Sequence, residues 1–351
     1  MRLDFTNRSK LVLNCAYSVG GDSMATIKAA ILGFGTVGQG IYNIVNEKRE
    51  DLKKSLGLEL EISAILVNNV GKERMATPGV LVTDNFEDII NIPGLQVVFE
   101  AIVNEEPAYN YLCRAIDKGC HVITANKVMF SKYSIPLHER AKSRGVFIGY
   151  EATTAGGVPV IKTLKNLLQV NSVKRIQGIL NGTSNYILTQ MRQDECPFDD
   201  SLKEAQDLGY AEADPFNDVS GQDAFRKLMI LSALAFKKQP NWNEVRVVGI
   251  DEISIEDVRK AKEQGLRYRH VAEIEQDENG ELYASVGPQL VGPDHPLYSI
   301  EGVNNAVALD TNYIGTLTLV GPGAGMYPTA SVMVEDYAEI IGKRAGFFIT
   351  I

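Results

Sequence analysis

Residues 27 to 38 read IKAAILGFGTVG, a sequence that predicts a buried strand, a tight turn and the start of a helix. Its first half is mostly apolar, which is typical of a strand buried in a parallel sheet. Its second half is a GxGxxG motif, after which Ile41, Ile44 and Val45 recur at helical spacing. Between a strand and a helix this motif indicates dinucleotide binding, because larger side chains would keep a pyrophosphate from the backbone amides and the positive helix end. A tight turn without a ligand is the alternative.

Strands and helices alternate from this motif to about residue 150. The pattern predicts strands at 60–67, 97–103, 122–124 and 146–150, and helices at 107–118 and 135–143. Such alternation is typical of a doubly wound Rossmann domain of the α/β class. A carboxylate after the second strand would favour NAD, because it would bind the adenosine ribose. Asn68 stands there instead, with Lys72 and Arg74 close behind, which favours NADP or the use of both cofactors.

Near Glu151 the regular alternation gives way to longer β-rich and helical segments. We therefore expect residues 24–150, together with 321–345, to form the dinucleotide-binding domain. Residues 151–320 are expected to form an α+β catalytic and dimerisation domain. Residues 1–23 show no clear period and are predicted to be a dispensable extension. The glycine-rich turn at 321–325 precedes an apolar helix that would return the chain to the first domain, although a hinge would explain the turn as well.

The stretch GYAEADPFNDVSGQDAFRK at residues 209–227 combines several carboxylates with one lysine. A proline and a glycine keep its first part out of a helix, and from residue 222 the pattern is helical. Asp223 and Lys227 are four residues apart and therefore share a helix face. An ammonium beside a carboxylate, opposite further acids, suits a catalytic site. An acid-rich helix start with one surface ion pair is the alternative.

Two further loops place polar groups at the ends of predicted strands. Lys127, in the TANK motif that begins at Thr124, follows the edge at which ligands of open α/β sheets bind. A solvated lysine that opens the next helix is an equal alternative. The loop NGTSNY at residues 181–186 offers amides and hydroxyls at a helix start, which suits a substrate carboxylate. Simple capping by Thr183 or Ser184 explains that loop equally well.

The composition argues against several classes of function. Of the 351 residues, 45% are hydrophobic and 23% are charged, as in an ordinary soluble globular protein. The net charge of -9 argues against nucleic acid or an anionic membrane as a partner. No apolar run approaches the roughly 20 residues of a membrane span. The four cysteines fit neither a disulfide framework nor a zinc site, so we expect a reducing, cytoplasmic location.

Taken together, the motifs resemble the homoserine dehydrogenase family. In the family's order they are GFGTVG at Gly33, TANK at Thr124, EATTAGG at Glu151, GILNGTSNY at Gly178, the stretch at 209–227 and GPGAG at Gly321. The resemblance covers almost everything from Ile27 to the last helix, and its most specific motif is the stretch at 209–227. It implies reversible reduction of L-aspartate 4-semialdehyde to L-homoserine with NADP(H) or NAD(H), in the biosynthesis of threonine, methionine and isoleucine.

The resemblance also implies roles for single residues. Lys227 would donate and accept the proton, with Lys127 as its partner near the nicotinamide. The substrate would contact Glu212, Asp218, Asp223, Tyr210, Gly182 and Thr183. The cofactor would contact Gly33, Phe34, Gly35, Thr36, Val37, Gly38, Asn68, Thr124, Lys127 and Gly325. The chemistry agrees, because hydride that arrives at an aldehyde carbon leaves an alkoxide, which requires a nearby proton or positive charge.

Three further expectations come from the resemblance. A structural sodium ion would be held by Glu151 and by the backbone carbonyls of Thr154, Gly156 and Val158. The chain would form a homodimer through its second domain. It resembles the short form without aspartokinase or C-terminal regulatory domains, so feedback inhibition by threonine is not expected. The sequence departs from the family at Val103 and Asn104, where a glycine pair is usual, and this departure bears on the nicotinamide geometry and the cofactor preference.

Two other functions stay open on the sequence alone. A reductase of the same architecture could act on another amino-acid semialdehyde or on an imine, although the acidic stretch and the two lysines disfavour it. A dinucleotide-sensing protein without catalysis would have little need for Lys127, Lys227, Asp223 and Glu212 together.

Overall fold

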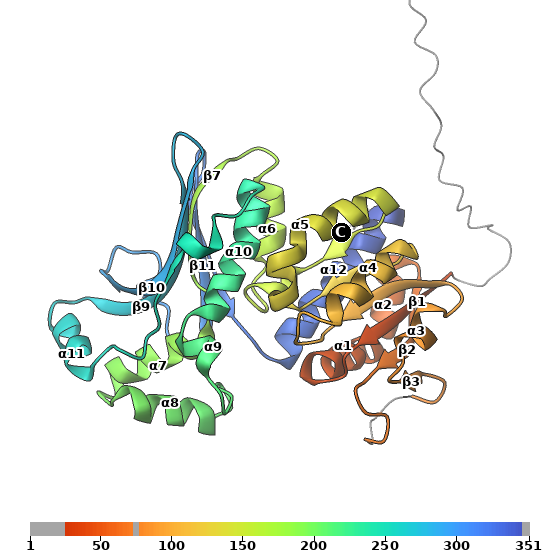
Figure 1. Ribbon diagram of the computed structural model, residues 1–351, viewed down its shortest axis with the longest axis horizontal. Coiled ribbons are helices and arrows are strands. Elements are labelled where there is room, and N and C mark those ends of the chain that lie inside the picture. Colours follow the sequence, from red (N-terminus) through yellow and green to blue (C-terminus); the bar gives the residue numbers. More distant parts are fainter. Residues whose placement is uncertain (1–24, 73–76, 346–351) are drawn as a thin grey trace, which may run out of the picture.

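The computed structural model describes residues 25–72 and 77–345, apart from the side chains of 343–345. Two sheets lie side by side, with helices packed between them (Figure 1). The expectations for residues 1–23 and for Arg74 lie outside the described residues. Within the described part of the chain, no helix has both the length and the apolar character needed to cross a membrane.

The first sheet has the strand order β3-β2-β1-β4-β5-β6, and its strand pairs are parallel. Its strands are β1 (Thr26–Leu32), β2 (Glu59–Leu66), β3 (Leu81–Thr83), β4 (Leu95–Glu100), β5 (His121–Thr124) and β6 (Ile148–Gly149). The chain builds outward from β1 to one side and then to the other, so the topological switch point lies between β1 and β4. The predicted Rossmann arrangement is confirmed, although β4 and β6 are shorter than expected.

Helices cover both faces of the first sheet. They are α1 (Thr36–Glu47), α2 (Arg49–Leu56), α3 (Phe86–Ile90), α4 (Ala108–Asp117), α5 (Lys127–Arg144) and, from the far end of the chain, α12 (Met326–Ala345). Helix α12 packs closely on α1, because a Cβ atom added at Gly40 would lie 2.9 Å from the Cβ atom of Ala330. Buried residues of α1, α12, β1 and β2 form one apolar cluster.

The predicted helix at 135–143 is wrong in its extent. The sequence pattern indicated only the second half of this helix. Helix α5 instead begins at Lys127 and continues through Pro136. Its start is fixed by Asn126, whose side chain accepts a hydrogen bond from the amide of Met129. This start places Lys127 in the first turn, directly after β5.

The second sheet has the order β12-β11-β7-β9-β10-β8 and is antiparallel except for the pair of β10 and β8. Its strands are β7 (Val173–Ile179), β8 (Arg246–Val247), β9 (Arg267–Gln276), β10 (Leu282–Val291), β11 (Asn304–Thr311) and β12 (Gly315–Pro322). The expected α+β class of this part is confirmed, because its strands pair mainly antiparallel, and β9–β10 and β11–β12 are hairpins.

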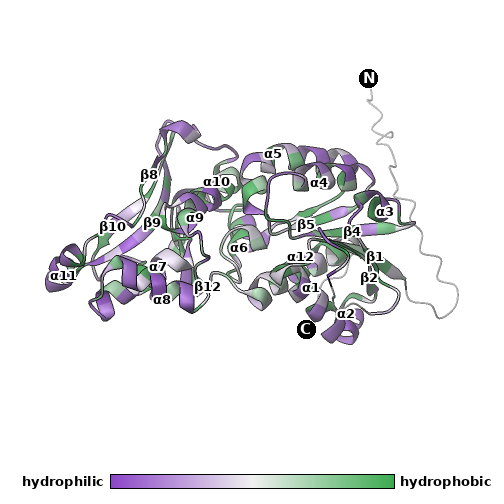
Figure 2. Cartoon of the chain, turned by 60° about the horizontal axis from the view of Figure 1, so that its bottom comes forward, coloured by the Kyte–Doolittle hydropathy of each residue, from purple (hydrophilic) through white to green (hydrophobic). Residues whose placement is uncertain are grey.

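The helices of the second part fall into two groups. Helices α6 (Val160–Leu167) and α10 (Gln222–Phe236) lie between the second sheet and α5 (Figure 1). Helices α7 (Gly182–Gln193), α8 (Phe198–Asp207), α9 (Phe216–Val219) and α11 (Ile255–Glu263) lie towards one end of the sheet. Helices α2, α8 and α11 are mostly hydrophilic and lie on the outside of the molecule (Figure 2). The buried helix α10, in contact with α5, therefore joins the two parts.

Candidate active site

Two lysines from different helices meet one buried aspartate. Lys227 lies in the second turn of α10, and its Nζ atom is 2.8 Å from Oδ2 of Asp223. Lys127 is the first residue of α5, and its Nζ atom is 2.5 Å from Oδ1 of the same carboxylate. The side chain of Asp223 is 3% exposed, against 9% for Lys227 and 41% for Lys127. Asp223 thus links a lysine of α5, which covers the first sheet, to a lysine of α10, which packs on the second sheet.

The charges in this triad favour different protonation behaviour for the two lysines. Burial lowers the pKa of Lys227, and the nearby Asp223 only partly opposes this change. The attraction of Asp223 raises the pKa of Lys127. Burial alone would raise the pKa of Asp223, but the two lysines hold it well below its usual range. Asp223 therefore stays ionised, and Lys227 is the lysine that releases its proton more readily.

Asn181 was not predicted as a site residue, although it connects the acidic groups. Its Oδ1 atom caps α7 by accepting the amide of Ser184, at 2.8 Å. Its Nδ2 atom donates to Asp218 at 2.7 Å and to Asp223 at 2.9 Å. Burial, and then the charge of Asp223, raise the pKa of Asp218. An asparagine directly after a strand and before a helix is a capping signal, but its second pair of bonds depends on tertiary packing.

The backbone carbonyl of Leu180 is a second anchor for Lys227. It accepts a hydrogen bond from Nζ of Lys227 at 2.6 Å and another from Nδ2 of Asn305 at 3.1 Å. The side chain of Asn305 also lies against the predicted cofactor turn, since a Cβ atom added at Gly323 would lie 2.1 Å from its Oδ1 atom. Lys227, the end of β7 and the glycine-rich turn before α12 are therefore held together.

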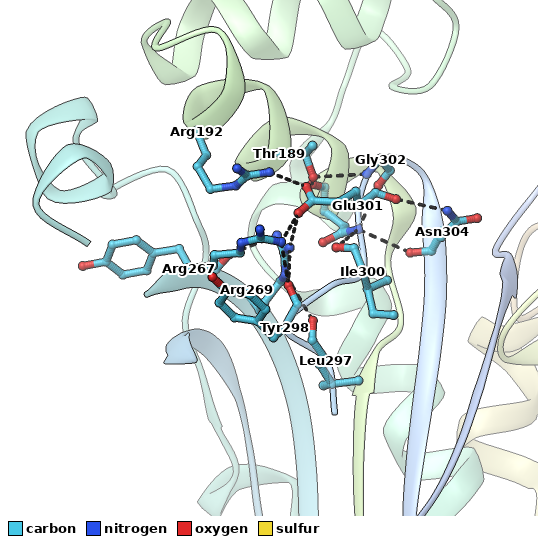
Figure 3. A network of polar contacts seen from close by, with 12 residues as sticks. Thr189, Arg192, Arg267, Arg269, Leu297, Tyr298, Ile300, Glu301, Gly302 and Asn304 are labelled. Carbon is cyan, nitrogen blue, oxygen red and sulfur yellow. Dashed lines mark hydrogen bonds and ion pairs between the residues drawn. The ribbon is translucent and has the colours of Figure 1, made fainter. Parts of the chain in front are cut away.

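A network of charged side chains around Glu301 holds the segment that packs against the start of α7. The carboxylate of Glu301 accepts hydrogen bonds from three arginines (Figure 3), which are Arg192 at 2.8 Å, Arg267 at 2.6 Å and Arg269 at 2.8 Å. These bonds fix the segment next to Glu301, and the side chain of Asn185 donates to the carbonyl of Gly302 at 2.9 Å. A Cβ atom added at Gly182 would lie 2.6 Å from the carbonyl oxygen of Val303. The predicted substrate residue Gly182 thus packs directly on this segment.

The other predicted substrate residues differ in burial, because Thr183 is buried whereas Tyr210 and Glu212 are exposed. The buried hydroxyl of Thr183 donates to the carbonyl of Tyr210 at 2.6 Å. Tyr210 is 44% exposed, and its ring centroid lies 5.0 Å from that of Tyr186. Glu212 is exposed, and its backbone carbonyl accepts a bond from Gln206. Among the described residues, no recorded hydrogen bond or ion pair joins the carboxylate of Glu212 to Asp218 or Asp223.

The segment between Pro215 and Gly221 differs from the expectation. It was predicted to stay out of a helix, yet residues Phe216–Val219 form the short helix α9. Pro215 precedes the first turn of α9, a position at which the missing N–H group costs nothing. Gly221, with φ of 86°, separates α9 from α10 and gives each helix its own direction.

The glycine turn after β1 has the geometry of a phosphate site. Gly33 has φ of 92°, and a Cβ atom added there would lie 2.7 Å from the carbonyl oxygen of Ala101. A Cβ atom at Gly38 would lie 2.0 Å from the carbonyl oxygen of Gly33, whereas one at Gly35 would meet nothing within 4 Å. Gly35 caps α1 without a side-chain bond, and the first turn holds no acid. The helix end is therefore open to an anion.

The remaining predicted cofactor positions surround the same edge of the sheet. Phe34, Thr36 and Val37 belong to the turn and the start of α1, and Thr124 ends β5. Asn68 is exposed just beyond β2. Gly325, with φ of 125°, lies immediately before α12. A Cβ atom at Gly156 would lie 2.4 Å from the carbonyl of Gly323, so the turn before α12 packs on the loop after β6.

The predicted sodium residues form that loop. The carboxylate of Glu151 is buried and accepts the amides of Ile161 at 2.7 Å and Lys162 at 2.8 Å, at the start of α6. Burial raises the pKa of Glu151 to about 7. The carbonyl of Val158 accepts the amide of Val160. The hydroxyl of Thr154 is buried and has no hydrogen-bond partner within the described part of the chain.

Comparisons with known proteins identify the family. The sequence model described as the NAD-binding domain of homoserine dehydrogenase matches residues 33–151, and that of homoserine dehydrogenase itself matches residues 159–338. The chain is 37% identical to the homoserine dehydrogenase of Bacillus subtilis over 91% of its own length and 73% of that protein's. The chain belongs to the homoserine dehydrogenase family.

Other homoserine dehydrogenases match along the same length. The NAD(+)-dependent homoserine dehydrogenase of Pseudomonas canavaninivorans is 33% identical and covers 90% of this chain and 97% of that protein. The crystal structure of the Thiobacillus denitrificans homoserine dehydrogenase matches with a TM-score of 0.87 and 37% identity, over 92% of this chain and 75% of that one. A hyperthermophilic archaeal homoserine dehydrogenase in complex with NADPH matches with a TM-score of 0.77 and 28% identity, over 92% and 99%.

Several expectations are thereby confirmed. The protein is an oxidoreductase that acts on a CH–OH group, its activity is that of a homoserine dehydrogenase, and it binds a nicotinamide dinucleotide and a small-molecule substrate. The reductase of another semialdehyde and the non-catalytic sensor are not supported. The roles of single residues stay predictions.

Proposed function

We propose that Lys227 is the acid–base group of this homoserine dehydrogenase. The observation that supports this role is the contact between Lys227 and Asp223, in which a buried ammonium with a lowered pKa lies beside a carboxylate that stays ionised. In the reducing direction, Lys227 gives a proton to the alkoxide that forms on the substrate. In the oxidising direction, the neutral amine removes the hydroxyl proton of homoserine. Asp223 stabilises the ammonium in both directions.

Lys127 supplies a second positive charge at the reacting oxygen. It is more exposed than Lys227 and its pKa is raised, so it stays protonated and acts through its charge. The carboxylates of Asp218 and Asp223 suit the ammonium group of the substrate, and the amides of Gly182 and Thr183 at the start of α7 suit its carboxylate. Tyr210 borders this space, and Glu212 is proposed as a further ligand from the exposed segment before α9.

The proposed cofactor site lies along the carboxyl edge of the first sheet. The open start of α1 at Gly35 would hold the pyrophosphate, with Gly325 and Thr124 nearer the nicotinamide. The nicotinamide, when bound, supplies or accepts the hydride. Asn68 offers no carboxylate for the adenosine ribose, which supports NADP or the use of both cofactors.

The function is tested by turnover of the purified protein. We expect it to reduce NADP⁺ or NAD⁺ in the presence of L-homoserine, and to oxidise NADPH or NADH in the presence of L-aspartate 4-semialdehyde. Absorbance of the reduced nicotinamide follows both reactions. A folded protein that binds the dinucleotide yet turns over neither pair would contradict the proposal.

We also propose a structural sodium ion at the loop after β6. The buried hydroxyl of Thr154 lacks a partner among the described residues, and hydroxyl and carbonyl oxygens suit a hard cation. Glu151 would supply the negative charge of this site. Its buried carboxylate is held in the same loop by the amides of Ile161 and Lys162. We expect the melting temperature to be higher in sodium than in potassium chloride at equal ionic strength, and Glu151→Gln to reduce that difference. Equal melting temperatures in both salts would exclude the site.

Oligomeric state, domain division and location are further proposals. Strands β10 and β12 carry exposed apolar side chains, including Tyr283 at 64%, Leu290 at 49% and Val320 at 51%, which a second copy of the chain would cover. Sedimentation at twice the chain mass would support this homodimer.

We place the domain boundary at residues 150 and 151, with α12 returning to the first domain. A cytoplasmic location is compatible with the absence of a disulfide among the described cysteines.

A further inference from the structure

The last residue of β4, Glu100, is a buried acid that plays no part in the mechanism above. It is fully buried at the carboxyl edge of the first sheet, next to Thr124 of β5. Its Oε1 atom accepts the amide of Ile102 at 2.7 Å, and its Oε2 atom accepts the hydroxyl of Thr124 at 2.5 Å. The side chain of Asn126 approaches Oε1 at 3.4 Å. All of these partners are neutral groups.

These bonds lead from Glu100 to the start of α5. The hydroxyl of Thr124, which donates to Glu100, accepts the amide of Asn126 at 2.9 Å. The side chain of Asn126 caps α5 through the amide of Met129 and also donates to the carbonyl of Asn104 at 2.8 Å. The next residue is Lys127, whose ammonium contacts Asp223 of helix α10. Glu100 therefore anchors both ends of the turn that carries Lys127.

We propose that Glu100 is a positioning residue, which sets the place of Lys127 opposite Asp223 through Thr124 and Asn126. The inference rests on the proposed role of Lys127. The ionised carboxylate fits this position because all the groups that face it are donors, and it accepts each of them. A neutral glutamine could still accept the amide of Ile102, but its NH₂ group would face the hydroxyl of Thr124 and leave that hydroxyl proton without an acceptor. The turn would then have to shift.

The pKa of Glu100 reflects the cost of burying its negative charge. Burial raises the pKa of Glu100 to about 7, while the three neutral donors lower it and no charged side chain contributes. A raised carboxyl pKa means that the folded state is favoured at low pH and loses stability as the pH rises through about 7. Glu100→Gln removes this cost. The melting temperature of Glu100→Gln minus that of the parent protein should therefore increase from pH 5 to pH 8. The activity of the variant should be lower than that of the parent.

The decisive experiment is a double-mutant cycle in homoserine oxidation at saturating cofactor. We expect Glu100→Gln to lower kcat/KM by roughly 10- to 100-fold, because a small displacement of a catalytic group has effects of that size. In a Lys127→Met background the same substitution should change kcat/KM by less than about twofold, since the group that it positions is already absent. An equal loss in both backgrounds, or full activity of Glu100→Gln, overturns the inference.

Further variants separate this inference from the proposed function and from misfolding. If Lys127→Met itself keeps full activity, the role of Lys127 fails and the inference fails with it; if it is impaired and Glu100→Gln is additive, only the inference fails. Should Glu100→Gln not fold, Thr124→Val breaks the same link, and Thr124→Ser should restore it. The matched control is Thr83→Val, which removes a buried hydroxyl that donates to Asp88 at 2.7 Å at the end of β3. That control should keep kcat unchanged, and a loss equal to that of Thr124→Val overturns the inference.

Discussion

Replacement of Lys227 by alanine is expected to lower kcat by roughly 100- to 10,000-fold, the range typical of a lost general acid–base group. The buried ammonium is held 2.8 Å from Asp223 and 2.6 Å from the carbonyl of Leu180, and alanine removes the group that carries the proton. Cofactor affinity should be nearly unchanged, because the glycine turn that would bind the pyrophosphate belongs to the first sheet. Steady-state kinetics and calorimetric titration with NADP⁺ measure the two effects.

The control for this variant is Lys238→Ala, which removes an exposed lysine just beyond the end of the same helix. It should leave both kcat and cofactor affinity intact. Near-full activity of Lys227→Ala would remove Lys227 from the mechanism, and parallel losses of cofactor binding and turnover would indicate a disrupted fold.

Replacement of Asp223 by asparagine is expected to cause the largest loss of stability. It leaves the ammonium groups of Lys127 and Lys227 facing each other without the carboxylate that lies between them. Removal of one partner from a buried ion pair costs about 3–5 kcal/mol, because the remaining charge is uncompensated. Unfolding in urea at pH 7 measures the loss, and turnover should fall with it.

The effect of Asp223 should depend on pH in one direction. The two lysines hold its folded-state pKa below the ordinary value of 3.8, so its contribution is present above that value and is lost as the pH falls below it. The difference in unfolding free energy between the parent protein and Asp223→Asn should therefore be full at neutral pH and smaller in acid. Asp218→Asn is the control, because its pKa is raised by burial and by Asp223, and its loss at pH 7 should be small. A pH-independent difference for Asp223→Asn would contradict the proposed charge balance.

Local sequence patterns were sufficient for the parts of the site that lie within one element. The glycine spacing at residues 33–38 predicted the turn, and the four-residue spacing of Asp223 and Lys227 predicted their ion pair. The contact of Lys127 with Asp223 could not be derived from spacing, since it depends on how α5 packs on α10. The same limit explains why Asn181 and Glu100 were missed, because each has a local hydrogen bond that a sequence can suggest and a distant partner that it cannot.

The helix boundaries that were predicted wrongly lie near prolines and a glycine. Helix α5 continues through Pro136, although a proline inside a helix removes one backbone hydrogen bond. Pro215 and Gly221 looked like helix breakers, although one precedes α9 and the other separates it from α10. Glu212 matched the family's motif, but its exposure is a property of the segment's path and not of its residue types.

The position of α12 has a consequence for synthesis of the protein on the ribosome. Strands β1 to β6 emerge first, but the helix that packs against α1 comes from the opposite end of the chain, after the whole second sheet. During translation the nascent first sheet therefore leaves the apolar residues of α1 uncovered until α12 appears. In this interval the uncovered apolar residues favour aggregation and offer a surface to which a chaperone can bind.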